Sequence, residues 1–92
     1  MKRYNYKIPN GKLIRIKIEL SNDKINYFKL SGDFFIYPEE KIIEIENSII
    51  GKSRNEYSKS LNETITRNNI QLVGLKEEDI TNIINNAFED EV

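Results

Sequence analysis

The sequence predicts an α+β fold, in which a three-stranded antiparallel meander is covered on one face by about three helices to make a two-layer sandwich. Up to Pro38, apolar residues alternate with polar ones, which is typical of strands with one buried face. After Pro38 the apolar residues recur at helical spacing. Short turn-forming segments separate the alternating runs, which favours antiparallel neighbours. The chain has 92 residues and room for one modest core, so residues 1–92 are expected to form a single domain.

Three alternating runs make up the predicted sheet. The first covers residues 3–8 and the second residues 13–20, with the turn residues Pro9-Asn10-Gly11-Lys12 between them. The third run covers residues 25–36 and contains Gly32, a residue that inside a strand often marks a bulge or a close backbone approach. Its inward positions are predicted to be Phe28, Leu30, Phe34 and Ile36.

Three helices are predicted after the strands. The first begins at Pro38 and ends at Gly51, and the second begins at a capping box over residues 53–56. Residues 70–75 are predicted to form a short apolar connector, and the last helix begins near Lys76. The apolar stripe of the first helix consists of Ile42, Ile45 and Ile49, widened by Ile43 and Ile50.

Charge is unevenly distributed along the chain, although the net charge is only −1. Residues 1–30 contain eight basic and two acidic residues, whereas the rest of the chain contains six basic and thirteen acidic ones. The two halves either neutralise each other within the fold or leave a basic face for an acidic or phosphorylated partner. Nucleic acid is not the expected partner, because the acidic half would repel a phosphate backbone.

The composition excludes several kinds of chemistry. The chain has no cysteine and no histidine, so disulfides, thiolate metal sites and Ser-His or Cys-His nucleophiles are absent. Its four glycines lie far apart and form no phosphate-binding loop. We therefore predict no catalytic, cofactor-binding or metal-binding residue, and an independent enzyme that uses carboxylates is the least favoured alternative. No membrane span or signal peptide is expected, which indicates a cytoplasmic protein.

The segment SGDFFIYPEE, residues 31–40, concentrates aromatic residues where strand gives way to helix. Phe35 and Tyr37 have the opposite parity to the predicted core residues, so they cover the outer side of the sheet, pack on a helix or form a docking patch. Asp33 lies at the same junction, and Arg15 and Lys17 form a positive stripe on the wet face of the second strand. The predicted partner interface consists of Arg15, Lys17, Asp33, Phe35 and Tyr37.

Three segments in order carry a family resemblance: IPNGKLIRIKIEL, then INYFKLSGDFFIYPEEKIIEIENSIIGK, then QLVGLKEEDITNII. Together they resemble the C-terminal accessory domain of lipoate–protein ligases, in which a (T/S)GDFF-x-x-PEE block leads into a helix and a GL-x-x-ED segment opens the last one. The GDFF…PEE block is the most specific part. Lys76 stands where relatives often have a serine or similar cap, so the start of the last helix is expected to be less well satisfied.

The resemblance implies a function through a partner. Because the chain starts at Met1, it matches the split archaeal form, in which the small subunit is a separate polypeptide. It is then the non-catalytic part of a heterodimer with the catalytic subunit of the ligase, and it is needed for activation of lipoate to lipoyl-adenylate. ATP, Mg²⁺ and lipoate are expected on the catalytic subunit, and lipoyl-domain proteins are the acceptors. The alternative is a freestanding interaction module that binds an acidic partner through its basic hairpin.

Overall fold

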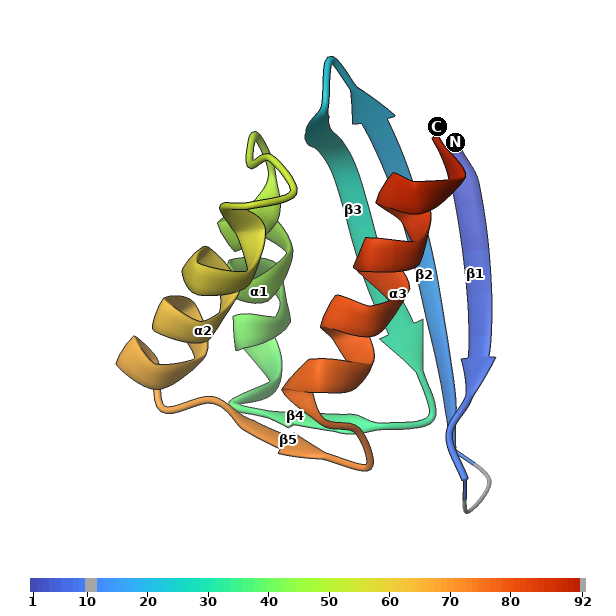
Figure 1. Ribbon diagram of the computed structural model, residues 1–92. Coiled ribbons are helices and arrows are strands. Elements are labelled where there is room, and N and C mark those ends of the chain that lie inside the picture. The colour runs from blue at the N-terminus through green and yellow to red at the C-terminus, as the bar shows by residue number, and fades with distance from the viewer. Residues whose placement is uncertain (10–11, 92) are drawn as a thin grey trace.

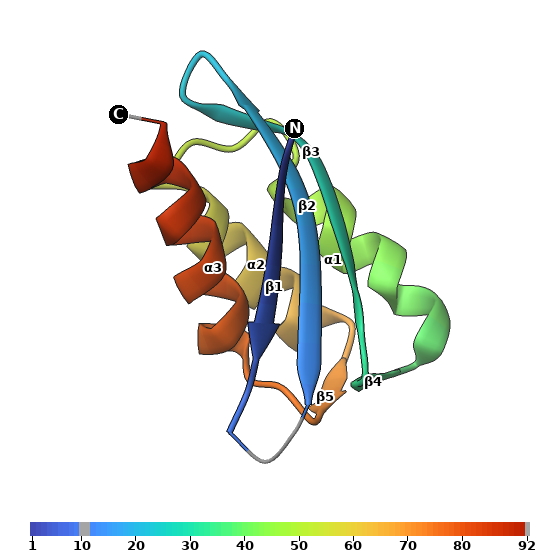
Figure 2. The same cartoon turned by 90° about the vertical axis from the view of Figure 1, so that its right-hand side faces the viewer.

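The computed structural model describes residues 1–9 and 12–91 and confirms the predicted α+β class. Three antiparallel strands form a sheet in the order β1-β2-β3, and three helices lie on one of its faces (Figure 1, Figure 2). The elements are β1 (Lys2–Lys7), β2 (Leu13–Ser21), β3 (Lys24–Gly32), β4 (Phe35–Tyr37), α1 (Ile42–Ile49), α2 (Tyr57–Arg67), β5 (Gln71–Val73) and α3 (Glu77–Asp90). The predicted turn residues Asn10 and Gly11 lie outside the described residues.

The sheet has one buried face, the dry face, and one solvent-exposed face, the wet face, as the alternation of residues in the central strand β2 predicts. Ile14, Ile16 and Ile18 are at most 1% exposed, whereas Arg15 and Lys17 are exposed on the other side. The dry face packs against α3 at β1 and β2, and against α1 at β3. Each buried isoleucine side chain contributes about 1.5–3 kcal/mol of transfer free energy, so this face supplies much of the core.

The third strand is shorter than predicted, because the chain leaves the sheet at Gly32. Gly32 has φ +148°, and the next N–H, that of Asp33, donates to the carbonyl oxygen of Leu13 at 2.9 Å. A single strand over residues 25–36 is therefore wrong. Apolar residues keep the same alternation beyond the break, because the residues that follow also bury one face. That face belongs to a different sheet.

That second sheet consists of β4 and β5, which pair antiparallel with Phe35 opposite Val73 and Tyr37 opposite Gln71. Residues 71–73 are thus a strand, where the sequence predicted a connector. Figure 1 shows the two short strands crossing the end of the molecule beneath the helices. Their inner face contributes Ile36, which is 6% exposed, to the core, as predicted, while Phe34 packs against the core only partly buried.

The first helix begins with a 3-10 turn over Glu39–Lys41, in which the Lys41 N–H donates to the Pro38 carbonyl. The α-helical part, α1, buries Ile45 and Ile49 completely. The predicted widening of its stripe is wrong, since Ile43 is 57% and Ile50 is 38% exposed. Ile43 lies off the side of α1 that packs against α2 and β3, and Ile50 follows the end of α1 in an extended conformation.

The other two helices begin with carboxylates that accept backbone N–H groups. Glu56 accepts from the N–H of Ser53 at 3.0 Å, which is half of the predicted capping box, and α2 begins directly after it. At α3, Asp79 accepts from the N–H of Lys76 at 2.8 Å. Lys76 makes no side-chain cap, as expected from its replacement of a serine-like residue, and Asp79 supplies only the reciprocal half of a capping box. None of the helices in the described ranges is long and apolar enough to cross a membrane.

A buried carboxylate joins α1 to the open edge of the sheet. Glu46 is 8% exposed, and its Oε2 accepts the N–H of Leu30 on β3 at 2.9 Å. This N–H points away from β2, so it has no ladder partner. The Nζ of Lys29 lies 3.9 Å from the other carboxylate oxygen. Helix α1 shields the Leu30 N–H from water, and Glu46 on the same helix supplies the hydrogen-bond acceptor.

We expect Glu46→Ala to lower the free energy of unfolding by about 1–3 kcal/mol, because it leaves the buried N–H group of Leu30 without an acceptor. Glu46→Gln retains an acceptor oxygen and should cost less. Chemical denaturation followed by circular dichroism measures both. Glu44→Ala, at an exposed position of the same helix, is the matched control and should stay within about 0.5 kcal/mol of wild type. Equal effects of the two alanine variants would contradict the role of Glu46.

Candidate functional site

Two exposed surfaces stand out, one aromatic and one basic. No group of three carboxylates converges to hold a metal ion in residues 1–9 and 12–91. The two-stranded sheet positions the aromatic surface, and the three-stranded sheet positions the basic one.

The first surface, here called the aromatic foot, consists of Phe35, Tyr37 and Val73. They are 58%, 53% and 46% exposed, respectively. Phe35 and Tyr37 are two residues apart on β4 and therefore point to the same side, with ring centroids 6.4 Å apart and nearly parallel planes. Val73 lies directly opposite Phe35 on β5. Large apolar side chains gathered on one face are typical of protein-binding surfaces.

A groove of about 430 Å³ opens beside the aromatic foot. Both aromatic rings line it, together with Gly32, Phe34 and Ile42 and with the polar residues Ser31 and Glu39. Two of the lining residues, Gly32 and Phe34, lie where the chain leaves β3 and leads into β4. An apolar side chain of a partner fits such a groove better than a polar ligand does, because apolar groups dominate its lining.

Asp33 stands at the edge of this region, exposed between β3 and β4. Its backbone N–H is bound to Leu13, but its carboxylate makes no hydrogen bond or ion pair with the other described residues. The fold thus uses the backbone of Asp33 and leaves the acid to solvent or to a partner.

The second surface, here called the basic face, is the wet side of the three-stranded sheet. Arg3 pairs with Lys17 across β1 and β2, and Lys17 pairs with Lys29 across β2 and β3. Three cations therefore form one row across the sheet. Arg15 and Lys7 lie at other outward positions of β2 and β1. The basic face is defined by Arg3, Lys7, Arg15, Lys17 and Lys29.

The predicted interface residues fall on these two neighbouring surfaces. Phe35 and Tyr37 stack on the aromatic foot, and Arg15 and Lys17 lie together on the basic face. The surfaces meet at Ser31, which lies opposite Arg15 in the sheet and also lines the groove. Sequence reasoning missed Val73, because residues 70–75 were not recognised as a strand. It also missed Lys29, although its alternation with Phe28 and Leu30 gives the outward direction.

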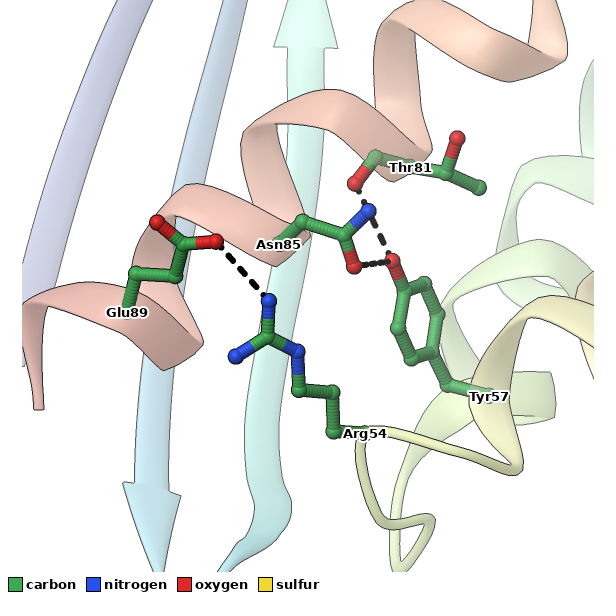
Figure 3. Close-up of polar contacts among 5 residues, drawn as sticks. All are labelled: Arg54, Tyr57, Thr81, Asn85 and Glu89. Carbon is green, nitrogen blue, oxygen red and sulfur yellow. Dashed lines mark hydrogen bonds and ion pairs between the residues drawn. The ribbon is translucent and has the colours of Figure 1, made fainter.

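A polar cluster between α2 and α3 holds the helical layer together (Figure 3). The hydroxyl of Tyr57, a residue 1% exposed, contacts the Thr81 carbonyl oxygen at 3.0 Å and Oδ1 of Asn85. It carries one proton and so donates to one of the two at a time. Beside it, Arg54 and Glu89 form an exposed ion pair at 2.9 Å. Burial raises the pKa of Tyr57 to about 12.

Stability should therefore fall in alkaline solution. The folded protein holds the Tyr57 proton up to about pH 12. The unfolded chain loses it near pH 10. Between these values the unfolded state binds fewer protons than the folded state, and a rise in pH therefore lowers the free energy of unfolding. Tyr57 contributes its full stabilisation below pH 10 and loses about 2–3 kcal/mol of it by pH 12. We expect the stability difference between wild type and Tyr57→Phe to shrink over this range, as measured by urea unfolding. A constant difference would contradict a buried neutral tyrosine.

No family model matches the chain. A search of curated proteins finds similarity to "Lipoate-protein ligase A subunit 2" of Thermoplasma acidophilum, with 39% identity over 49 residues. That match covers 53% of this chain and 51% of the relative, so the chain spans about half the length of the curated relative that it matches.

The fold is also similar to that of a chain in a solved archaeal lipoylation system, described as a bipartite lipoate protein ligase and its E2 lipoyl domain from Thermoplasma acidophilum. The TM-score is 0.76 with 28% identity, over 87% of this chain and 89% of that chain. The resemblance to the accessory part of lipoate–protein ligases is thereby confirmed at the level of both sequence and fold.

Proposed function

We propose that this chain, which is similar in sequence and fold to the small subunit of a two-part lipoate–protein ligase, is itself the non-catalytic accessory subunit of such a ligase. In this function it binds the catalytic subunit as a heterodimer in the cytoplasm and is needed for the ATP-dependent conversion of lipoate to lipoyl-adenylate. The observation that carries the proposal is the structural match over 89% of a chain from a bipartite ligase.

The reacting groups belong to the catalytic subunit in this proposal. ATP, Mg²⁺ and lipoate bind there, and this chain contributes no catalytic residue. The absence of cysteine and histidine from its sequence supports that division. Adenylation requires the carboxylate of lipoate to be held in line with the α-phosphate while water is excluded. A subunit without reactive groups promotes such a step by binding the closed form of its partner more tightly than the open form.

The aromatic foot is the proposed contact with the catalytic subunit. Phe35 and Tyr37 expose more than half of their surface, and the groove beside them accepts an apolar side chain. Buried aromatic residues at the centre of an interface contribute most of the binding free energy. Asp33 lies at the rim, where a charge sets orientation and partner choice rather than affinity. Arg15 and Lys17 are the remaining proposed partner contacts.

Reconstitution tests the proposal. The catalytic subunit is incubated with ATP, Mg²⁺ and lipoate, with and without this chain, and pyrophosphate release is measured in the absence of acceptor protein. We expect substantial adenylate formation only in the mixture, with half-saturation at the dissociation constant of the heterodimer. Equal rates with and without this chain would remove the proposed function. An unrelated acidic protein of similar size controls for non-specific stabilisation of the large subunit.

A freestanding interaction module is the second candidate function, and the basic face favours it. In that case the chain binds an acidic protein that has no part in lipoylation. Pull-down with the purified chain distinguishes the two: recovery of the catalytic subunit supports the accessory role. The module is supported if another protein is recovered without the catalytic subunit. Substitution of Arg15→Glu and Lys17→Glu should then abolish recovery of that protein.

A further inference from the structure

The outer edge of β3, which no strand of the sheet covers, is partly covered by other elements. At the beginning of the strand, the loop after α1 pairs with this edge through hydrogen bonds of 2.9 and 2.6 Å to the backbone of Ile25. Helix α1 packs against β3 and supplies the Glu46 acceptor for the Leu30 N–H. The last residues of the strand, from Leu30 to Gly32, line the groove beside the aromatic foot. The edge therefore meets an open groove at this end.

Backbone groups at this end of β3 point away from the sheet and have no partner. The N–H of Asp33 donates to Leu13 on β2, so the carbonyl of Gly32, in the same trans peptide, points the opposite way. Because hydrogen-bonded pairs alternate along an antiparallel ladder, Leu30 and Gly32 both direct their N–H and C=O groups away from β2. No group in the described ranges binds the Leu30 C=O or either backbone group of Gly32. Leu30 is only 2% exposed, so its carbonyl oxygen is also largely removed from water.

We propose that an extended segment of the catalytic subunit adds to β3 over Leu30–Gly32 as a further strand of the sheet. This inference rests on the proposed function and specifies how the partner binds beside the aromatic foot. The N–H of Gly32 donates to the added segment, and the carbonyl oxygens of Gly32 and Leu30 accept from it. Alternate side chains of the segment then lie over the groove.

An extended segment fits these groups better than a helix does. A helix binds its own N–H and C=O groups and has none left along its length for a neighbouring edge. An extended segment directs the N–H and C=O of every second residue toward the edge, which is the spacing at which Leu30 and Gly32 present theirs. The largely apolar lining of the groove in turn selects apolar side chains from the segment.

The opposite edge of the sheet, on β1, is less suited to such an addition. That strand carries Lys2, Arg3 and Lys7, and charged side chains on an edge strand oppose the pairing of another strand with it. The stretch Leu30–Gly32 is uncharged, and its glycine has no side chain to obstruct an approaching backbone. The same stretch leads directly into the aromatic foot, so one partner can contact both.

Amide hydrogen exchange in the intact heterodimer tests this inference. The chain is labelled with ¹⁵N, and the exchange rates of residues 31–33 are compared between the free chain and the heterodimer. We expect the Gly32 N–H to exchange rapidly in the free chain and about a hundredfold or more slowly in the heterodimer, because it then binds a carbonyl oxygen. Ser31 and Asp33 are internal controls: their N–H groups point toward β2 and should exchange slowly in both samples.

The nature of the acceptor is identified by a scalar coupling across the hydrogen bond, between the ¹⁵N nucleus of Gly32 and a backbone ¹³C carbonyl of a deuterated, labelled catalytic subunit. Slow exchange of Gly32 without that coupling would mean that side chains cover the edge, and would overturn the added strand. An unchanged Gly32 rate in a heterodimer that forms adenylate would overturn it too, while the proposed function would stand.

Two further outcomes separate this inference from its alternatives. Slow Gly32 exchange in the free chain that becomes faster on dilution would assign the edge to a second copy of this chain and overturn the proposal. Absence of both binding and adenylate formation would remove the proposed function, and the inference with it. That result is distinguishable, because the heterodimer then never forms.

Discussion

The double substitution Phe35→Ser/Tyr37→Ser is expected to weaken binding to the proposed partner, the ligase catalytic subunit, by about a hundredfold or more. Loss of a buried aromatic anchor costs about 2–4 kcal/mol, and each 1.4 kcal/mol is a factor of ten. The fold should survive, because both rings are more than half exposed and the inward residue Ile36 is unchanged. Isothermal titration calorimetry gives the affinity, and adenylate formation at fixed subunit concentrations should fall in parallel.

Ile50→Ser is the matched control for this experiment. Ile50 is another exposed apolar residue, 38% exposed, but it follows α1 at the end remote from β4 (Figure 1). It should leave affinity and adenylate formation unchanged. If the control and the aromatic double variant weaken binding to the same extent, the aromatic foot is not the interface. If neither does, the catalytic subunit binds elsewhere on the chain.

The largest expected effect on stability is that of Gly32→Ala, with a loss of about 3 kcal/mol or more. A Cβ atom at this position would lie 2.1 Å from the carbonyl oxygen of Leu13, which belongs to the backbone of the neighbouring strand. The φ of +148° is also one that residues with a side chain rarely adopt, at a cost of about 1–3 kcal/mol by itself. Relief of the contact needs movement of β2 or of the turn into β4.

Gly51→Ala separates the cost of the contact with Leu13 from the cost of the positive φ. Gly51 also has positive φ, +82°, but an added Cβ would meet nothing within 4 Å. It should therefore lose only the conformational part, about 1 kcal/mol. Urea unfolding measures both variants. Similar losses at the two glycines would show that the contact with Leu13 is relieved without cost. Since Gly32 also lines the groove, its variant should weaken binding to the catalytic subunit beyond the fraction that unfolds.

The amino-acid sequence by itself determined the class of the fold and most of its core. Alternation in β2 and helical spacing in α3 each admit one buried side, so Ile14, Ile16, Ile80 and Ile84 could be assigned without a structure. It also determined that Phe35 and Tyr37 face away from the core, because neighbouring residues of a strand point to opposite sides. The GDFF…PEE block carried the family resemblance that the comparisons confirm.

Tertiary structure alone decided where the third strand ends and with what β4 pairs. Parity is the same in one long strand as in two short ones, whereas the break at Gly32 depends on the Leu13 carbonyl, which the fold brings close from β2. Contacts between distant residues also decided that Glu46 is buried at a sheet edge and that Arg3, Lys17 and Lys29 form one row. Register across strands and the coverage of an edge are relations between segments, and no local pattern of residues encodes them.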